Sequence, residues 1–131
     1  YAFVEEVKRL LGDDPSVFLR PIQFQPLYGK WQGQICKGLQ AHILDPYALR
    51  SYKLALSILK VAMDQGGEAF QWKNPPYEYD HKTLPIKLIL GDLEADQALT
   101  REGLNSDYWS DGLTQYKESV KPHLLYKREI I

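Results

Sequence analysis

The sequence of 131 residues lacks several features that would point directly to a function. It has a single cysteine, Cys36, which excludes a disulfide within the chain and leaves its redox compartment open. Its 16 basic and 17 acidic residues give a net charge of -1, so charge does not favour nucleic acid or an anionic membrane as a partner. No apolar run approaches the ~20 residues of a membrane-spanning helix, so we expect no such segment.

The short motifs of metal and cofactor sites are also missing. Neither HExxH nor CxxC occurs, and the three histidines, at positions 42, 81 and 123, match no metal-ligand spacing with Cys36. Neither a dinucleotide-binding GxGxxG nor a phosphate-binding P-loop is present. A nucleophile pair of Cys36 and His42 is disfavoured because six residues of extended chain span roughly 20 Å. We therefore expect no metal and no cofactor.

What remains is the composition of an ordinary globular domain. Hydrophobic residues make up 44% and charged residues 25% of the chain, and the length suits one domain with one core. The chain begins with Tyr1 rather than methionine and enters helical periodicity at once. We expect it to be part of a longer protein.

The spacing of apolar residues predicts four helices. Asp45-Pro46 resembles the start of the longest one, because aspartate is a favoured N-cap and proline suits the first helical position. The helices are expected from about residue 2 to 11, from Asp45-Pro46 to Gly66-Gly67, from Asp92 to about Glu102, and from Asn105 or Ser106 to Pro122. The longest helix is expected to bury a stripe of Leu49, Tyr52, Leu56, Leu59 and Met63.

Strand signals are few and short. Residues 17–25 are extended, but Pro21 restricts them to an edge strand or two pieces. The stretch GLQAHIL, residues 38–44, alternates as a half-buried strand, and residues 70–73 and 123–126 are short candidates. Residues 86–90 fit either a strand or a helical turn. The predicted class is α/β or α+β: a single domain with a small mixed sheet packed by about four helices.

The alternation of GLQAHIL predicts which side chains are free to act. Leu39, Ala41 and Ile43 are expected to face the core, and Gln40 and His42 to face away from it. An amide beside an imidazole is a compact set of donors and acceptors, suited to a sugar hydroxyl or an acetamido group. The alternative, a polar sheet face covered by a helix or open to water, fits the pattern equally well.

A second candidate group lies in the polar segment 77–81. On an extended chain the carboxylates of Glu78 and Asp80 point one way, with Cα atoms ~6.6 Å apart, which overlaps the separation used in glycoside hydrolysis. Any exposed acidic pair at this spacing would look the same, so a solvated loop edge is the alternative. Aromatic residues suited to stacking on a pyranose are Trp31, Trp72, Tyr77 and Tyr79, although Trp72 also suits a core.

Three ordered segments carry a family resemblance: GQICKGLQAHILD, then FQWKNPPYEYD with the later LPIKLILG, then WSDGLTQYKESVKPHLLY. Together they resemble the C-terminal domain of the exo-β-N-acetylmuramidase (NamZ-like) family, long known as a bacterial domain of unknown function. The resemblance runs from about Phe18 to Tyr126. The positions that match its motifs are Cys36, Gln40, His42, Asp45, Trp72, Tyr77 and Glu78.

The resemblance implies a two-domain glycoside hydrolase. A Rossmann-like N-terminal domain would carry most of the catalytic apparatus, residues 1–131 would form the auxiliary domain behind it, and the substrate cleft would lie between them. The implied reaction removes terminal N-acetylmuramic acid from the non-reducing end of peptidoglycan fragments during cell-wall recycling. The expected partners are that catalytic domain and those fragments, and the isolated chain is expected to be inactive. A periplasmic or secreted location and a cytoplasmic one both remain open.

By the same resemblance, Gln40, His42, Tyr77 and Glu78 are expected to bind substrate at the cleft, with Glu78 in at most a supporting catalytic role. The sequence departs from the family pattern at Lys37, Leu44 and Lys87, where glycine, threonine and aspartate are expected, so the exact sugar stays open. Two alternatives are a stand-alone carbohydrate-binding module and a structural or dimerising domain without ligand. Solvent exposure of His42 and Tyr77 separates the structural alternative from the other two readings.

Overall fold

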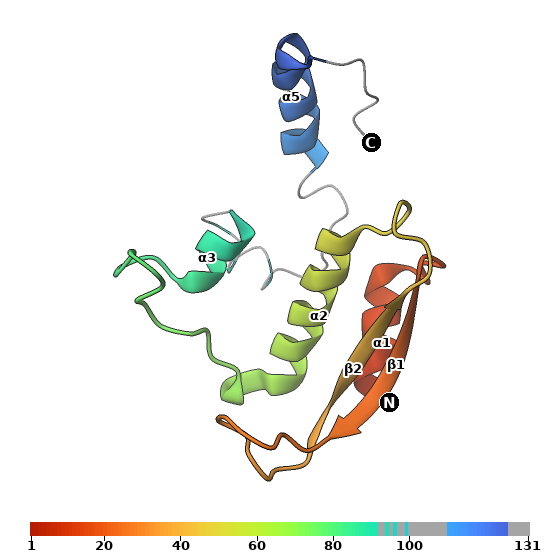
Figure 1. Ribbon diagram of the computed structural model, residues 1–131, viewed down its shortest axis with the longest axis vertical. Helices are drawn as coiled ribbons and strands as arrows, with labels where there is room; N and C mark the ends of the chain where they lie inside the picture. Colours follow the sequence, from red (N-terminus) through yellow and green to blue (C-terminus); the bar gives the residue numbers. More distant parts are fainter. Residues whose placement is uncertain (92–93, 95, 97–98, 100–109, 126–131) are drawn as a thin grey trace.

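The protein is described by a computed structural model that covers residues 1–91, 94, 96, 99 and 110–125. Figure 1 shows two long strands beside α1 and α2, with α3 on the other side of α2. The elements in chain order are α1 (Ala2–Leu11), β1 (Val17–Phe24), β2 (Cys36–Ile43), α2 (Ser51–Gly66), η1 (Gly67–Ala69), α3 (Pro85–Leu90), α5 (Ser110–Val120) and η2 (Lys121–His123). The predicted class, a small domain that mixes helices with a small sheet, is confirmed.

The two strands form an antiparallel ribbon. The register runs from Val17 opposite Ile43 to Phe24 opposite Cys36 without a break. Pro21 lies inside β1, so of the two predicted alternatives the edge strand is correct. In a two-stranded ribbon each strand has one unpaired edge, where the missing N–H of a proline is tolerated.

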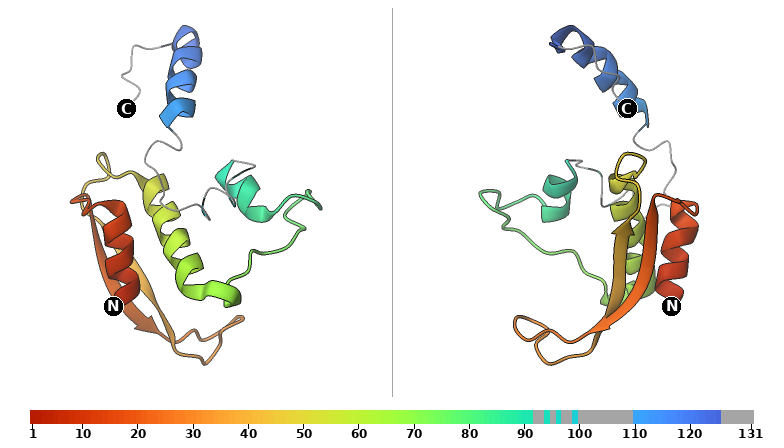
Figure 2. Two further views of the ribbon diagram at one scale, coloured as in Figure 1. Left: turned by 180° about the vertical axis from the view of Figure 1, so that it is seen from behind. Right: turned by 45° about the vertical axis from the view of Figure 1, so that its right-hand side comes forward.

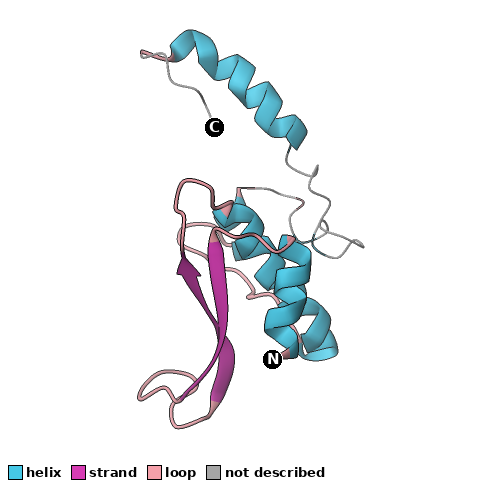
Figure 3. Ribbon diagram, turned by 90° about the vertical axis from the view of Figure 1, so that its right-hand side faces the viewer, coloured by secondary structure: helices cyan, strands magenta, loops and turns pink. Residues whose placement is uncertain are grey.

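The core lies between the ribbon and the first two helices. Its cluster of buried residues comprises Val4, Val7, Leu11, Val17, Leu19, Leu54 and Val61, and Leu39 and Ala41 of β2 pack against it. Figure 3 shows the helices on one side of the ribbon. Successive side chains of a strand point to opposite faces, so Val17, Leu19, Leu39 and Ala41 face the helices, and the other face is uncovered by α1 and α2.

The junction between α1 and α2 is held by a lysine. The ammonium group of Lys53 on α2 donates a hydrogen bond of 2.8 Å to the carbonyl of Leu11 at the end of α1. A cation there satisfies a carbonyl that has no partner within the helix and interacts favourably with the helix dipole. One turn further along α2, the buried hydroxyl of Ser57 donates to the carbonyl of Lys53 at 2.9 Å.

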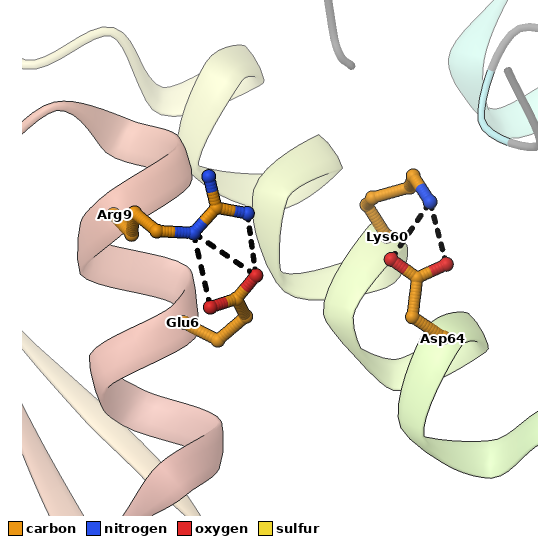
Figure 4. Close-up of polar contacts among 4 residues, drawn as sticks. All are labelled: Glu6, Arg9, Lys60 and Asp64. Atoms are coloured by element: carbon orange, nitrogen blue, oxygen red, sulfur yellow. Dashed lines mark hydrogen bonds and ion pairs between the residues drawn. The ribbon is translucent and has the colours of Figure 1, made fainter. Parts of the chain in front are cut away.

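Both α1 and α2 carry ion pairs that stay within one helix. Figure 4 shows Arg9 bonded to both carboxylate oxygens of Glu6, and Lys60 bonded to both oxygens of Asp64. Hydrogen bonds and charge from Arg9 lower the pKa of Glu6 below its usual value. Because these pairs do not join separate elements, they orient side chains along one helix without fixing how the elements pack.

The start of α2 differs from the prediction. Asp45 does act as a cap, since its side chain accepts hydrogen bonds from the amides of Tyr47 and Ala48 at 2.9 and 3.1 Å. It caps only a turn, and the helix begins at Ser51. Asp-Pro signals a turn as well as a helix start, and the sequence alone does not separate the two. The predicted end at Gly66-Gly67 is correct.

The buried stripe of α2 also differs. The buried residues are Leu54, Leu56, Ser57 and Val61, whereas the predicted Tyr52 is exposed. Leu54, Ser57 and Val61 recur at helical spacing, and Leu54 and Val61 belong to the core cluster. Leu56 lies on another face, so α2 is buried on two sides and a single-stripe pattern does not describe it.

Two short strands were predicted where the described residues form none. Residues 70–73 form no strand, and the rings of Phe70 and Trp72 instead pack edge to face with centroids 4.9 Å apart. His123 ends η2, and Leu124 and Leu125 belong to no strand. Residues 86–90, which fitted either structure, form the helix α3. A short extended run becomes a strand only when a neighbour offers a free edge, which local sequence does not reveal.

Two other predictions fall largely outside the described residues. They are most of the expected helix from Asp92 to Glu102 and the expected start of the next helix at Asn105 or Ser106. The described part of that next helix is α5, which is followed by Pro122 in η2 as expected. Among the helices that the structure describes, none combines the length and apolarity required to cross a bilayer.

The turn between α1 and β1 is stabilised by an ionised carboxylate. Hydrogen bonds from the hydroxyl and the backbone amide of Ser16, at 2.5 and 2.9 Å, hold the pKa of Asp14 below its usual value. The resulting stability is present above the pKa of an unfolded aspartate, about 3.9, and is lost as the pH falls through the lower folded value. We predict that Asp14→Asn makes the stability less dependent on pH below about 4, measured by urea unfolding at several pH values.

Asp13→Asn is the matched control for this prediction. Asp13 is the exposed neighbour of Asp14, and its side chain makes no hydrogen bond that the structure shows. Below pH 4, the free energy of unfolding of Asp13→Asn should depend on pH much as it does in the unmodified chain. Equal curves for Asp14→Asn and the unmodified chain would contradict a role for this carboxylate.

Candidate functional site

The candidate site is the outer sheet face, which we define as the alternate residues of β1 and β2 that lie on the side away from α1 and α2. Its eight members are Phe18, Arg20, Ile22, Phe24, Cys36, Gly38, Gln40 and His42. Phe18 and Phe24 are 53% and 49% exposed although both are large and apolar. The predicted orientation of Gln40 and His42 away from the core is confirmed.

Arg20 and Gln40 form a hydrogen-bonded pair across the ribbon. They are direct partners in the register, and a guanidinium N–H of Arg20 donates to the amide oxygen of Gln40 at 2.6 Å. Both side chains are exposed. The bond holds the guanidinium in place and leaves the amide N–H donors of Gln40 available to a ligand. Arg20 was missed in the sequence because only the pairing register brings it opposite Gln40.

Two rings lie next to this pair. Phe18 and His42 are also direct partners, with ring centroids 6.1 Å apart and planes tilted by 46°. His42 is half-buried. At the other end of the face, a Cβ at Gly38 would lie 4.0 Å from the ring of Phe24, so this ring covers the glycine. The face therefore combines apolar ring surface with an amide, an imidazole and a guanidinium.

The second predicted group lies in a tight turn. Tyr77 and Asp80 exchange backbone hydrogen bonds of 2.9 and 3.0 Å, and Glu78 occupies the turn with φ of 51°. The chain is thus not extended here, and the interpretation of Glu78 and Asp80 as side chains held in parallel by an extended backbone is wrong. Tyr77 is half-buried, and Glu78 and Tyr79 are exposed.

Asp80 has a structural task in this turn. Its carboxylate accepts hydrogen bonds of 2.7 Å from the amides of Thr83 and Lys82. These backbone bonds, joined by one from the Thr83 side chain, hold the pKa of Asp80 below its usual value. A carboxylate that stays ionised is unsuited to act as a general acid, and its bonds to two backbone amides give it a structural task in the turn.

The structure separates the two predicted groups. Gln40 and His42 lie on the ribbon, whereas Tyr77 and Glu78 lie in the segment between α2 and α3. Figures 1 and 2 show the ribbon and this segment on opposite sides of α2. Among the described residues, the recorded hydrogen bonds and ring contacts do not join one group to the other. Within this chain they form two separate regions.

An open hollow of about 600 Å³ lies beside the start of α1. It is lined by Tyr1, Ala2, Phe3, Val4, Pro21, Ile22, Gln23, Lys37, Gly38 and Gln65. It includes none of the four predicted substrate residues. Within the described part of the chain, no three His, Cys, Asp or Glu side chains are grouped as metal ligands.

Comparisons with known proteins identify the family. The family described as "Exo-beta-N-acetylmuramidase NamZ, C-terminal" matches residues 1–126. A curated relative, the peptidoglycan beta-N-acetylmuramidase NamZ of Bacillus subtilis (strain 168), is 33% identical over 58 residues, which cover 44% of this chain and 14% of that protein.

A solved structure supports the fold. The crystal structure of a DUF1343 family protein from Bacteroides fragilis NCTC 9343 superposes with a TM-score of 0.66 at 18% sequence identity, over 95% of this chain and 33% of that one. The chain thus spans about a third of the solved relative. The match over nearly all of its length shows that the chain belongs to the family of NamZ C-terminal domains.

Proposed function

We propose that this chain is the C-terminal domain of a peptidoglycan-processing protein similar to exo-β-N-acetylmuramidases, and that it forms one wall of the substrate cleft. The observation that carries the proposal is the family match over residues 1–126. The uncovered outer sheet face supports the cleft wall, because its ring surface and polar groups suit a sugar.

The catalytic apparatus is assigned to a Rossmann-like domain that precedes this one in the longer protein. Two observations support this division. The chain covers 14% and 33% of the two relatives, so each relative has a large additional part. In addition, Asp80, the acidic residue two positions after Glu78, has its carboxylate bonded to two backbone amides of the turn and so has a structural task there. Glu78 would therefore have at most a supporting role.

Within the proposed wall, Gln40 and His42 would position a substrate sugar through hydrogen bonds. Tyr77 and Glu78 would contact the substrate or the catalytic domain from the other side of α2. Their separation from the outer sheet face means that the two regions are testable independently, by variants that leave the other region intact.

The first test is a titration of the chain with N-acetylmuramic acid and a chromogenic muramide, followed by amide chemical shifts and by product release. We expect shifts in β2 around Gln40 and His42 without hydrolysis. The double variant Gln40→Ala with His42→Ala should weaken binding about tenfold or more, the loss expected from removing two hydrogen bonds.

The matched control removes the same side chains elsewhere. Gln115 and His123 are exposed on α5 and η2, and the double variant Gln115→Ala with His123→Ala should bind like the unmodified chain. Equal binding by both double variants would remove the outer sheet face from the proposal. Hydrolysis by the chain alone would contradict the assignment of catalysis to another domain.

The exposure of the candidate residues bears on the two alternatives. A purely structural domain would bury the face with Gln40 and His42 against a helix, but this face is uncovered by α1 and α2. A stand-alone carbohydrate-binding module would gather its aromatic residues in one flat patch. Instead, Trp31 lies in the loop between β1 and β2, whereas Trp72 packs on Phe70 beyond α2. Both observations support the cleft wall.

A further inference from the structure

The outer sheet face carries a positive charge that no acidic residue balances. Arg20 is its one permanently charged member, and none of the other seven residues is aspartate or glutamate. Among the described residues, the ion pairs of the structure do not include Arg20. Arg9 provides the contrast, because its guanidinium is already bonded to both oxygens of Glu6 (Figure 4).

The guanidinium of Arg20 is also held in a defined place. Its bond to Gln40 uses one of five N–H donors, so a fork of donors remains for a second partner. Guanidinium groups bind carboxylates through two parallel hydrogen bonds, a geometry that an ammonium group does not reproduce. Gln40 is a neutral acceptor, so its hydrogen bond leaves the positive charge of Arg20 uncompensated. The guanidinium is therefore still able to bind an anion.

The surroundings of Arg20 restrict which anion fits. Along β1 the next side chains on the same face are Phe18 and Ile22, and Phe18 is paired with the ring of His42. A small inorganic anion would leave this apolar surface in water. A ligand with a carboxylate attached to a ring that has an apolar side would cover it.

We infer that Arg20 binds the lactyl carboxylate of N-acetylmuramic acid and thereby determines the sugar specificity of the outer sheet face; this inference rests on the proposed function. N-acetylmuramic acid is N-acetylglucosamine with a lactyl ether at O3, and this group supplies the carboxylate. The sugar ring would lie on Phe18 and His42 and the acid on Arg20. Gln40 acts here as a positioning residue for the guanidinium.

The experiment compares these two sugars on the chain and its variants, with amide chemical shifts of β1 and β2 as the readout. We expect N-acetylmuramic acid to bind more tightly than N-acetylglucosamine. Arg20→Gln should lower the affinity for N-acetylmuramic acid about tenfold, the size expected for a charge-assisted bidentate contact. It should change the affinity for N-acetylglucosamine by less than about twofold. Arg20→Lys keeps the charge without the fork and should give an intermediate loss.

Arg9→Gln is the matched control, since it removes an exposed arginine that already has a carboxylate partner, and it should change neither affinity. Sodium chloride should weaken only the binding of N-acetylmuramic acid. If both sugars bind the outer sheet face and Arg20→Gln weakens both equally or neither, the inference is wrong and the proposed function stands. If neither sugar shifts this face of the folded chain, the proposed cleft wall is wrong and the inference falls with it.

Discussion

Replacing Leu19 by alanine is expected to lower the free energy of unfolding by about 2–5 kcal/mol. Leu19 is 2% exposed in the middle of β1 and belongs to the core cluster formed with α1 and α2. Truncation removes its apolar contacts and leaves a cavity that neighbouring strands and helices fill only in part. Since domains of this size are stable by about 5–15 kcal/mol in total, urea unfolding should show a clear shift of the midpoint.

Leu27→Ala is the control with the same chemistry. Leu27 lies in the loop between β1 and β2 and is 83% exposed, so its removal should change stability by less than about 0.5 kcal/mol. Similar losses for the two variants would mean that the inner side of the ribbon is not packed as described.

Gly67→Ala is expected to cost about 1–3 kcal/mol, measured in the same way. Gly67 follows α2 with φ of 47° and ψ of -128°, a conformation that residues with a Cβ rarely adopt. No heavy atom lies within 4 Å of the position where its Cβ would be. The cost is therefore backbone strain and not a collision.

Gly112→Ala is the same substitution at a position where we expect a gain in stability instead of a loss. Gly112 lies inside α5, and a Cβ there would also meet nothing within 4 Å. Alanine favours a helix over glycine by up to about 1 kcal/mol, so this variant should be slightly more stable. A loss at Gly112 equal to that at Gly67 would contradict the conformational explanation.

The elements that were predicted correctly are those whose signals are local. The helix at 2–11 has apolar residues at helical spacing and a glycine at its end, and Gly12 adopts φ of 82° there. The alternation of residues 38–44 correctly predicted a strand, which runs over Cys36–Ile43, and the side to which Gln40 and His42 point. Ile43, which was expected to face the core, is instead 47% exposed at the end of that strand.

The errors have a common physical cause, which is dependence on partners distant in the sequence. Asp45 caps a turn or a helix equally well, and the choice depends on how the following residues pack. In the part of the chain that the structure describes, residues 70–73 pair with no strand, and the rings of Phe70 and Trp72 pack on each other. For the same reason the sequence did not indicate Arg20 as a site residue. Its place opposite Gln40 arises from the pairing of two strands that are separated by a loop.

The two-stranded ribbon also has a consequence for how the chain behaves at high concentration. Within the described residues, β1 and β2 pair only with each other, so each has one edge with backbone groups that are open to a strand from another molecule. Pro21 removes one backbone donor from β1, whereas β2 contains no proline. Strand addition between molecules would therefore proceed more readily at the free edge of β2 than at that of β1.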